Sequence, residues 1–333
     1  MSQKILILGG TGAMGVYLVP ELLHMGYQVH VISLDEKKSD HPHLVYTKAD
    51  AMDDGVLHDL LQNGYDAVVD FMLYHSTEKF KNRHAMLLEN TGHYLYLSSY
   101  RVYADKDPVI TEGSPRLLDV SKDRKFVSSN DYAMFKARQE DVLKQSCFQN
   151  WTILRPAVTF SKRRYQLVTL EANTLIYRAF HNKPVVLPKE AMPVQGTMTW
   201  SGDVAKMISR LVCNPKAYQE CFTVATAEHH TWEEIAGFYQ ELCGLKYVTV
   251  DTETYLRAVS LEEVDWGVRR QLMYDRLFDR VIDNRKILAV TGLKQSEFMP
   301  VKDALRLELQ NLPHDTVWPD TVVNEKMDAL LNV

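Results

Sequence analysis

The sequence has few cysteines and no long apolar run. Only four of its 333 residues are cysteines, and no two of them have Cys-x-x-Cys spacing. Disulfide frameworks and zinc sites need closely spaced cysteines, so both are disfavoured. No stretch approaches the roughly 20 apolar residues of a membrane-spanning helix. The N-terminus leads straight into a strand-like run without the layout of a signal peptide. We therefore expect a cytoplasmic protein with reduced thiols.

An excess of positive charge is also missing. The chain has 38 basic and 43 acidic side chains, which gives a formal net charge of −5. Proteins that bind nucleic acids rely on clustered positive charge, so a nucleic acid is not expected as the main partner. The histidine pairs His41/His43 and His229/His230 have no further ligands at metal spacing, so we expect surface histidines and no metal site. Chemistry on a small molecule is the class that remains.

Short strand-like runs alternate with helical ones over about the first 155 residues. The expected strands cover 4–8, 28–32, 44–47, 67–71, 94–97 and 151–154, and the expected helices cover 13–25, 55–62, 77–89 and 131–145. This alternation predicts an α/β fold with a doubly wound parallel sheet of the Rossmann type.

The regular alternation of strand-like and helical runs ends after Pro156. The sequence there predicts helices at 165–181, 202–212, 231–242, 252–262 and 301–311, and strands at 184–187, 221–225 and 246–250. There is no internal repeat and no Gly/Ser-rich linker. We therefore expect a smaller second lobe that packs over the carboxyl ends of the parallel strands and closes a ligand cleft.

A glycine-rich turn follows the first predicted strand and opens the first predicted helix. It reads Gly9-Gly10-Thr11-Gly12-Ala13-Met14-Gly15 and contains G-x-x-G-x-x-G. Glycines allow a tight turn and close approach of the backbone to a pyrophosphate, and the helix N-terminus adds N–H groups and positive potential. The motif in this context predicts a dinucleotide site. Asp50, after the third strand, is a further candidate because its carboxylate can accept a hydrogen bond from adenine; the alternative role of helix N-cap suits Asp53 better.

Three polar residues in two segments are candidates for acid/base chemistry. Tyr132 and Lys136 are four residues apart and so share one helix face. A cation beside a phenol favours the phenolate and lowers its pKa, which makes Tyr132 a candidate general acid/base. Ser99 follows the fifth strand, at the sheet edge that faces the ligand crevice. An ordinary strand-to-loop turn and an exposed helix face are the alternatives for these residues.

Together and in this order, these motifs resemble the extended short-chain dehydrogenase/reductase superfamily, in its NAD-dependent epimerase/dehydratase-like branch. The segments Leu154-Arg155-Pro156 and Thr199-Trp200-Ser201-Gly202-Asp203-Val204-Ala205 resemble further segments of that branch. The resemblance implies a dinucleotide-binding domain at 1–160 and 194–228, and a substrate-binding lobe at 161–193 and 229–333.

The resemblance also implies a mechanism. Tyr132 would exchange a proton with a substrate hydroxyl or carbonyl, and Ser99 would hold the substrate oxygen. Lys136 would lower the pKa of the tyrosine and bind the nicotinamide ribose. A hydride would pass between the substrate carbon and the nicotinamide of NAD or NADP, which is chemistry that the cofactor supplies.

The choice between NAD and NADP depends on the end of the second strand. In relatives, an acidic residue at the end of the second strand usually binds the NAD ribose. The corresponding position in this chain is near Ser33, and Asp35 follows two residues later. Asp35 in that role would select NAD, which we favour slightly. Alternatively, Ser33 with Lys37 or Lys38 would hold the 2′-phosphate of NADP.

The substrate is less well defined. Dehydratases of this branch carry an acidic pair where this chain has Tyr100 and Arg101, so a 4,6-dehydratase is disfavoured. Arg163 and Arg164 lie where relatives bind a nucleotide-sugar phosphate, although a solvated basic loop is an equal alternative.

We therefore expect an NAD(P)-dependent epimerase-like oxidoreductase acting on a sugar nucleotide or a related hydroxylated metabolite. Two alternatives remain: a reductase or dehydrogenase of a non-nucleotide carbonyl, and an RNA-binding or regulatory protein on the same scaffold. Relatives often dimerise through the helix that carries the tyrosine. Phe135, Val142 and Leu143 could serve such a homodimer, or could simply be buried within one chain.

Overall fold

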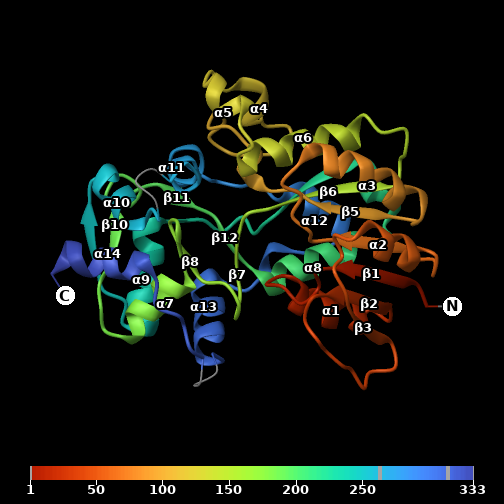
Figure 1. The fold of residues 1–333 in the computed structure, drawn as a ribbon, viewed down its shortest axis with the longest axis horizontal. Coiled ribbons are helices and arrows are strands. Elements are labelled where there is room, and N and C mark those ends of the chain that lie inside the picture. Colours follow the sequence, from red (N-terminus) through yellow and green to blue (C-terminus); the bar gives the residue numbers. More distant parts are fainter. Residues whose placement is uncertain (1, 262–264, 313–315, 333) are drawn as a thin grey trace.

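The computed structural model describes residues 2–261, 265–312 and 316–332. In this part of the chain, seven parallel strands form one sheet in the order β3-β2-β1-β4-β5-β6-β13 (Figure 1). The strands are β3 (Leu44–Lys48), β2 (Gln28–Ser33), β1 (Lys4–Leu8), β4 (Ala67–Asp70), β5 (Tyr94–Leu97), β6 (Trp151–Pro156) and β13 (Glu220–Val224). The predicted doubly wound parallel sheet is confirmed.

Both faces of the sheet are covered by helices. One face packs against α1 (Gly15–His24), α8 (Ser201–Leu211) and α12 (Arg285–Thr291), and the other against α2 (Asp54–Leu61), α3 (Thr77–Glu89) and α6 (Tyr132–Lys144). Residues of β1 alternate between the two cores: Ile5 and Ile7 face the first group, Leu6 and Leu8 the second, and all four are fully buried. This double burial explains why the strand is a continuous apolar run instead of an alternating one.

The strand order reverses beside β1, because the chain runs from β1 to β2 and β3 on one side and then returns to β4 on the other. Such a switch point opens a crevice at the carboxyl ends of the strands, where ligands bind in open α/β sheets. The glycine-rich turn follows β1 and the candidate Ser99 follows β5, so both lie at this edge.

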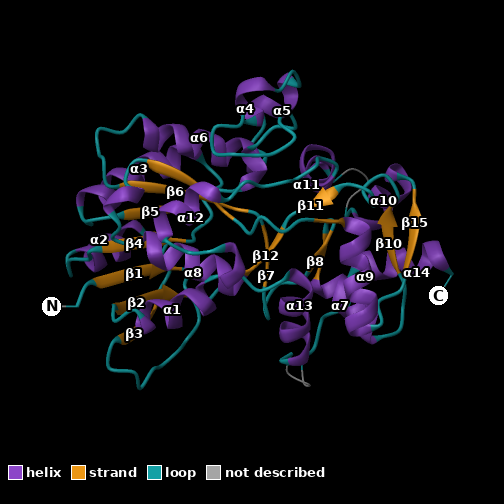
Figure 2. Cartoon of the chain, turned by 180° about the vertical axis from the view of Figure 1, so that it is seen from behind, coloured by secondary structure: helices purple, strands orange, loops and turns teal. Residues whose placement is uncertain are grey.

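The rest of the chain forms a second group of elements with its own apolar core (Figure 2). Its strand pairs are β7 (Val158–Phe160) with β12 (Met198–Trp200), β8 (Gln166–Leu167) with β9 (Leu170–Glu171), β10 (Val185–Pro188) with β15 (Tyr247–Val250), and β11 (Gln195–Gly196) with β14 (His230–Thr231). Its helices are α7 (Ala172–Phe180), α9 (Trp232–Cys243), α10 (Thr252–Val259), α11 (Trp266–Gln271), α13 (Val301–Gln310) and α14 (Val322–Leu331).

Short helices complete the fold. Two of them, α4 (Leu117–Val120) and α5 (Arg124–Ser128), pack on α6 (Figure 1). The single-turn segments are η1 (Tyr100–Val102), η2 (Pro215–Ala217), η3 (Leu272–Arg276) and η4 (Gln295–Glu297). No helix in the described ranges is long and apolar enough to cross a membrane.

One predicted helix is wrong in its first half. Residues 165–181 were expected to be helical, but the structure forms the hairpin β8–β9 before α7 begins at Ala172. Val168 in the hairpin turn has φ of 53°, which is unusual for a β-branched residue. Arg276, from a distant segment, donates from Nε to the Val168 carbonyl at 2.7 Å. A contact between residues 108 positions apart cannot be read from local periodicity. The expected helix at 252–262 ends instead at Val259, and residue 262 lies outside the described residues.

The proposed division of the chain stays a prediction, but the packing bears on it. The segment 220–224 joins the sheet as β13, inside the range assigned to the dinucleotide-binding domain. Ile287 and Phe298, assigned to the substrate lobe, pack in the core between the sheet and α8.

Candidate functional site

The glycine-rich turn is shaped by close backbone contacts. Gly9 has φ of 76°, in the left-handed region that favours glycine. A Cβ on Gly15 would lie 2.3 Å from the Gly10 carbonyl oxygen, so the start of α1 touches the turn backbone. Met14, the N-cap of α1, provides no side-chain cap. The cradle has no room for larger side chains and exposes a helix N-terminus, so these residues fit a dinucleotide pyrophosphate.

The residues predicted for the adenosine end of the cofactor lie on the same sheet edge. Ser33 ends β2, and its Oγ accepts a hydrogen bond from the Asp35 amide at 2.9 Å. Asp35 and Asp50 are exposed, and the Asp50 carboxylate accepts from the Met52 amide at 2.8 Å. The helix-capping role falls to Asp53, which accepts from the Val56 amide at 2.9 Å. Asp35 and Asp50 therefore keep carboxylate oxygens open to solvent, and their ligand roles stay predictions.

The three predicted catalytic residues line one cavity. Ser99, Tyr132 and Lys136 surround a space of about 390 Å³ at the carboxyl ends of the strands, together with Met14 of the glycine-rich turn. Ser99 is the N-cap of η1, and its Oγ accepts from the Arg101 amide at 3.2 Å. Tyr132 and Lys136 both lie on α6, which begins at the cap Asp131. Fold and sequence spacing thus bring the cofactor turn and the acid/base candidates to one place.

Lys136 is buried with its charge directed at the sheet. Its Nζ donates to the Leu97 carbonyl at 2.5 Å and lies 5.9 Å from the centre of the Tyr132 ring. Burial lowers the pKa of Lys136 to about 8, although Asp70 and Glu140 act in the opposite direction. The ammonium is therefore partly deprotonated just above neutral pH.

The expected lowering of the Tyr132 pKa is wrong for the protein by itself. Burial raises the pKa of Tyr132 above its ordinary value, while Arg101, Arg164 and a hydrogen bond with Ser99 act against that rise. The physical reason is that desolvation outweighs the nearby cations, and that Lys136 points at a carbonyl instead of the phenol oxygen. Tyr132 is consequently a neutral phenol at pH 7, ready to donate a proton.

Two buried carboxylates that sequence reasoning missed act on the charge of Lys136. Glu140 is fully buried one turn after Lys136; it accepts from Arg155 Nε at 2.8 Å and from Ser98 Oγ at 2.6 Å. Asp70, also buried, accepts from the hydroxyls of Tyr74 and Tyr94, each at 2.7 Å. The i, i+4 spacing of Lys136 and Glu140 was available in the sequence as a signal that both face the sheet.

The two arginines predicted to bind substrate occupy different positions relative to the cavity. Arg164 lines the cavity and forms an ion pair with Glu171 at 3.6 Å. Arg163 is exposed and is not among the residues that line the cavity. Phe135 and Leu143 on α6 were considered for a homodimer contact. Both are buried within the single chain, which matches the alternative explanation for their apolar character.

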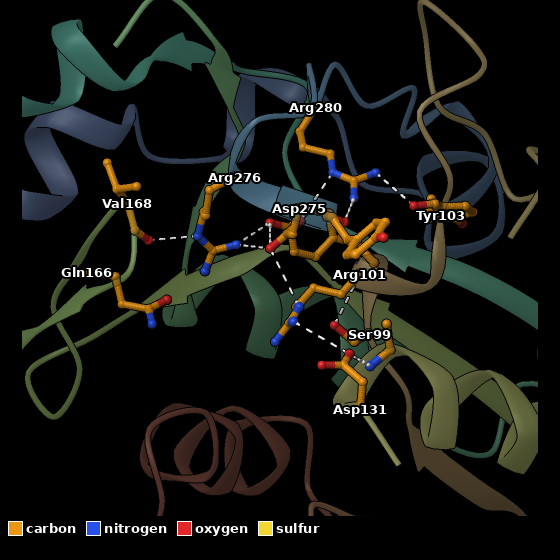
Figure 3. A network of polar contacts seen from close by, with 12 residues as sticks. Ser99, Arg101, Tyr103, Asp131, Gln166, Val168, Asp275, Arg276 and Arg280 are labelled. Atoms are coloured by element: carbon orange, nitrogen blue, oxygen red, sulfur yellow. Dashed lines mark hydrogen bonds and ion pairs between the residues drawn. The ribbon is translucent and has the colours of Figure 1, made fainter. Parts of the chain in front are cut away.

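A second set of polar residues lies at the far wall of the cavity (Figure 3). Arg101, Gln166 and Arg276 all line the cavity, and none of them was predicted as a site residue. Asp275 lies behind them, fully shielded from solvent. Three separate chain segments supply this wall, so no single motif marks it.

The comparison with protein families decides the identity. The model of the "NAD dependent epimerase/dehydratase family" matches residues 5–224, about two thirds of the chain. The chain belongs to this family. The matched range contains the glycine-rich turn, Ser99, Tyr132 and Lys136.

Solved structures of low sequence identity share the fold. The enzyme WbmH of Bordetella bronchiseptica, in complex with NAD⁺, is 16% identical, with a TM-score of 0.69 over 95% of this chain and 100% of that one. The UDP-N-acetylglucosamine 4-epimerase of Bacillus cereus is 15% identical, with a TM-score of 0.66 over 93% and 99% of the two chains.

One curated relative is named for binding and not for an enzymatic reaction. The chloroplast stem-loop binding protein of 41 kDa b from Arabidopsis thaliana is 25% identical over 250 residues, which are 70% of this chain and 61% of that protein. The match thus spans about three fifths of the relative's length.

Proposed function

We propose that this protein is an NAD(P)-dependent epimerase-like oxidoreductase that acts on a sugar nucleotide or a related hydroxylated metabolite. The observation that carries the proposal is that Ser99, Tyr132 and Lys136 line the same cavity as Met14 of the glycine-rich turn. Segments 1–160 and 194–228 would bind the cofactor, and 161–193 and 229–333 the substrate. A nicotinamide cofactor, when bound, supplies the hydride donor or acceptor.

The residues of the chain have distinct tasks in this reaction. The Tyr132 phenol donates its proton to a substrate carbonyl oxygen, or takes one from a hydroxyl in the reverse direction. The Ser99 hydroxyl orients that oxygen. The Lys136 ammonium, anchored on Leu97, offers its remaining N–H groups to the cofactor ribose and favours the phenolate when the tyrosine loses its proton.

The cofactor preference follows from the residues after β2. Asp35 is exposed and free to accept hydrogen bonds from a ribose, which supports a modest preference for NAD. Lys37, whose Nζ lies 5.9 Å from the centre of the Tyr46 ring, would instead serve the 2′-phosphate of NADP. Dissociation constants for NADH and NADPH separate the two, and much tighter NADPH binding would reverse the preference.

Tyr132→Phe tests the proposal most directly. The substitution removes the transferable proton and little else, so turnover of any accepted substrate should fall by at least 100-fold, while NADH affinity stays within about 2-fold of wild type. Turnover and NADH fluorescence are the measurements. Tyr247→Phe, on β15 and outside the cavity, is the matched control and should behave as wild type. Near-normal turnover by Tyr132→Phe would sink the proposed role.

An epimerase and a reductase differ in how they hold the cofactor. An epimerase oxidises and re-reduces the same substrate, so it retains NAD(H), which should copurify. A reductase or dehydrogenase of a non-nucleotide carbonyl releases the cofactor and needs it added. Mass spectrometry of the protein as purified therefore distinguishes the two.

A second candidate function is nucleic-acid binding on the same scaffold. It is favoured by the similarity to the stem-loop binding protein. The net charge of −5 and the intact Ser99, Tyr132 and Lys136 support the enzyme instead. Tight, strongly salt-dependent binding of a stem-loop RNA, with no turnover of sugar nucleotides or carbonyls, would reverse this ranking.

A further inference from the structure

The far wall of the candidate cavity carries more positive than negative charge. Three guanidinium groups, those of Arg101, Arg276 and Arg280, surround the carboxylate of Asp275 (Figure 3). Arg276 contacts that carboxylate directly, and Arg280 Nε lies 3.2 Å from Asp275 Oδ1. Asp131 Oδ1, 3.9 Å from Arg101, is the second carboxylate nearby. Two carboxylates do not balance three guanidinium groups, so part of the positive charge lacks a partner.

Arg276 and Arg280 each make several hydrogen bonds within the protein. Arg276 donates from Nη1 to the Tyr100 hydroxyl at 2.8 Å, in addition to its bond to the β8–β9 hairpin. Arg280 donates from Nη1 to the Tyr103 carbonyl at 3.1 Å. These contacts join η3 and the following loop to η1 and to Tyr103 after it, so the two arginines build the wall.

Arg101 differs from both. Its side chain is 15% exposed and lines the cavity, but its nearest carboxylates lie at 3.7 Å (Asp275 Oδ2) and 3.9 Å (Asp131 Oδ1), beyond hydrogen-bond range. The Nε atom is buried, and no acceptor in the described residues is within hydrogen-bond distance of it. A largely desolvated guanidinium without hydrogen bonds is costly unless a ligand provides an acceptor.

The position of Arg101 relates it to the reacting atoms. Its guanidinium carbon lies 5.1 Å from the centre of the Tyr132 ring, and it follows Ser99 by two residues. A group bound by Arg101 therefore lies a few bonds from the carbon whose oxygen Tyr132 protonates. The pyrophosphate of a sugar nucleotide is remote from its reacting sugar carbon, so it is not the group expected here.

Gln166 provides an independent sign of a missing polar ligand. It is fully buried and lines the same cavity, and its side-chain oxygen has no hydrogen-bond partner among the residues described. Its side-chain nitrogen donates to Glu171, which fixes the orientation of the amide. The free oxygen needs a donor, such as a substrate hydroxyl.

We propose that Arg101 is a specificity-determining residue that binds a carboxylate on the substrate next to the reacting carbon, so that the substrate is a hydroxylated acid such as a uronic-acid sugar. The planar guanidinium fork matches a carboxylate in shape. A phosphate, with up to two negative charges, would be repelled more strongly by Asp131 and Asp275, each within 4 Å of Arg101. This inference rests on the proposed function, because it assumes that Tyr132 is the proton donor.

The experiment compares two matched pairs of probes on the full-length protein saturated with NADH. UDP-glucuronic acid and UDP-glucose differ only at C6, where the acid has a carboxylate and the neutral sugar a hydroxymethyl group, and free D-glucuronate and D-glucose differ in the same way. Titration calorimetry should show at least 10-fold tighter binding of the acid member of a pair. Arg101→Gln should weaken binding of that acid about 30-fold, leave the neutral sugar within about 3-fold and leave NADH unchanged. Arg101→Lys should recover part of the affinity, since it keeps the charge without the fork.

The controls separate this inference from the proposed function and from a structural role. Arg270→Gln, whose guanidinium lies over the Phe126 and Trp266 rings and not in the cavity, should bind every probe as wild type does. Failure of the wild type to bind either NADH or NADPH would overturn the proposed function itself. If NADH binds but neither pair shows preference for the acid, or Arg101→Gln weakens NADH and both sugars alike, the carboxylate site is wrong. Because the wild-type comparison needs no variant, the test holds even if Arg101→Gln does not fold.

Discussion

Burial of the Lys136 side chain changes the pH at which it loses its charge. Its side chain is 1% exposed, and burial lowers its pKa from 10.5 to about 8. The folded protein therefore gives up the lysine proton at lower pH than the unfolded chain does. In the pH range between the two pKa values, the unfolded state binds more protons than the folded state, so stability rises with pH.

This difference predicts how stability depends on pH. Between pH 7.5 and 10.5, the free energy of unfolding of wild type should increase relative to that of Lys136→Met by up to about 3 kcal/mol. Urea denaturation of both proteins at several pH values measures this difference. If the difference in unfolding free energy between wild type and Lys136→Met stays constant across this pH range, the Lys136 ammonium is not desolvated as the structure indicates.

At the level of secondary structure, the start of α1 decides whether a cofactor can be held. The turn before the helix closes so tightly that the Gly10 carbonyl touches the Gly15 backbone. The two glycines thus set the distance between β1 and α1, and with it the position of the helix N-terminus.

Gly15→Ala should separate this packing from ordinary helix propensity. The new Cβ would meet backbone at 2.3 Å, so α1 has to move, and we expect a loss of about 1–3 kcal/mol in stability and at least 10-fold weaker NADH binding. The measurements are urea denaturation and NADH fluorescence. The control is Gly237→Ala in α9, where a Cβ meets nothing within 4 Å and should stabilise by roughly 0.5–1 kcal/mol. Equal effects of the two substitutions would contradict this account of the turn.

Across the whole molecule, Glu308 links the two groups of elements. It lies on α13 and is 3% exposed. It accepts hydrogen bonds from the Tyr17 hydroxyl on α1 and from Trp200 Nε1 at the end of β12, the latter at 2.5 Å. A single carboxylate thus joins the helix of the cofactor turn to a C-terminal helix.

Glu308→Ala should show how much these hydrogen bonds contribute to the stability of the protein. Two partly buried donors lose their acceptor, so we expect a loss of about 2–4 kcal/mol in unfolding free energy. Glu241→Ala is the matched control, because its ion pair with Lys302 also reaches α13 but is solvent-exposed, and its loss should cost less than about 1 kcal/mol. Thermal or urea denaturation measures both, and a mild effect of Glu308→Ala would mean that apolar packing alone holds the two parts together.

Local sequence patterns were sufficient for most of the sheet and for the cofactor turn. The apolar runs at 4–8 and 94–97 lie where β1 and β5 form, because strands buried on both faces must be continuously apolar. Glycines at fixed spacing after a strand, and Tyr132 with Lys136 at helical spacing, are equally local signals. The β8–β9 hairpin escaped prediction because Arg276 holds its turn from far along the chain.

The far wall of the cavity, by contrast, exists only in the folded molecule. Arg101, Gln166 and Arg276 come from η1, β8 and η3, and nothing in their spacing brings them together. The same applies to the pKa of Tyr132: the sequence shows a neighbouring cation, whereas burial, which depends on every element packed around the ring, sets the direction. Periodicity and turn chemistry act over a few residues and are legible in the sequence; desolvation and the sharing of one carboxylate among three arginines arise from long-range packing.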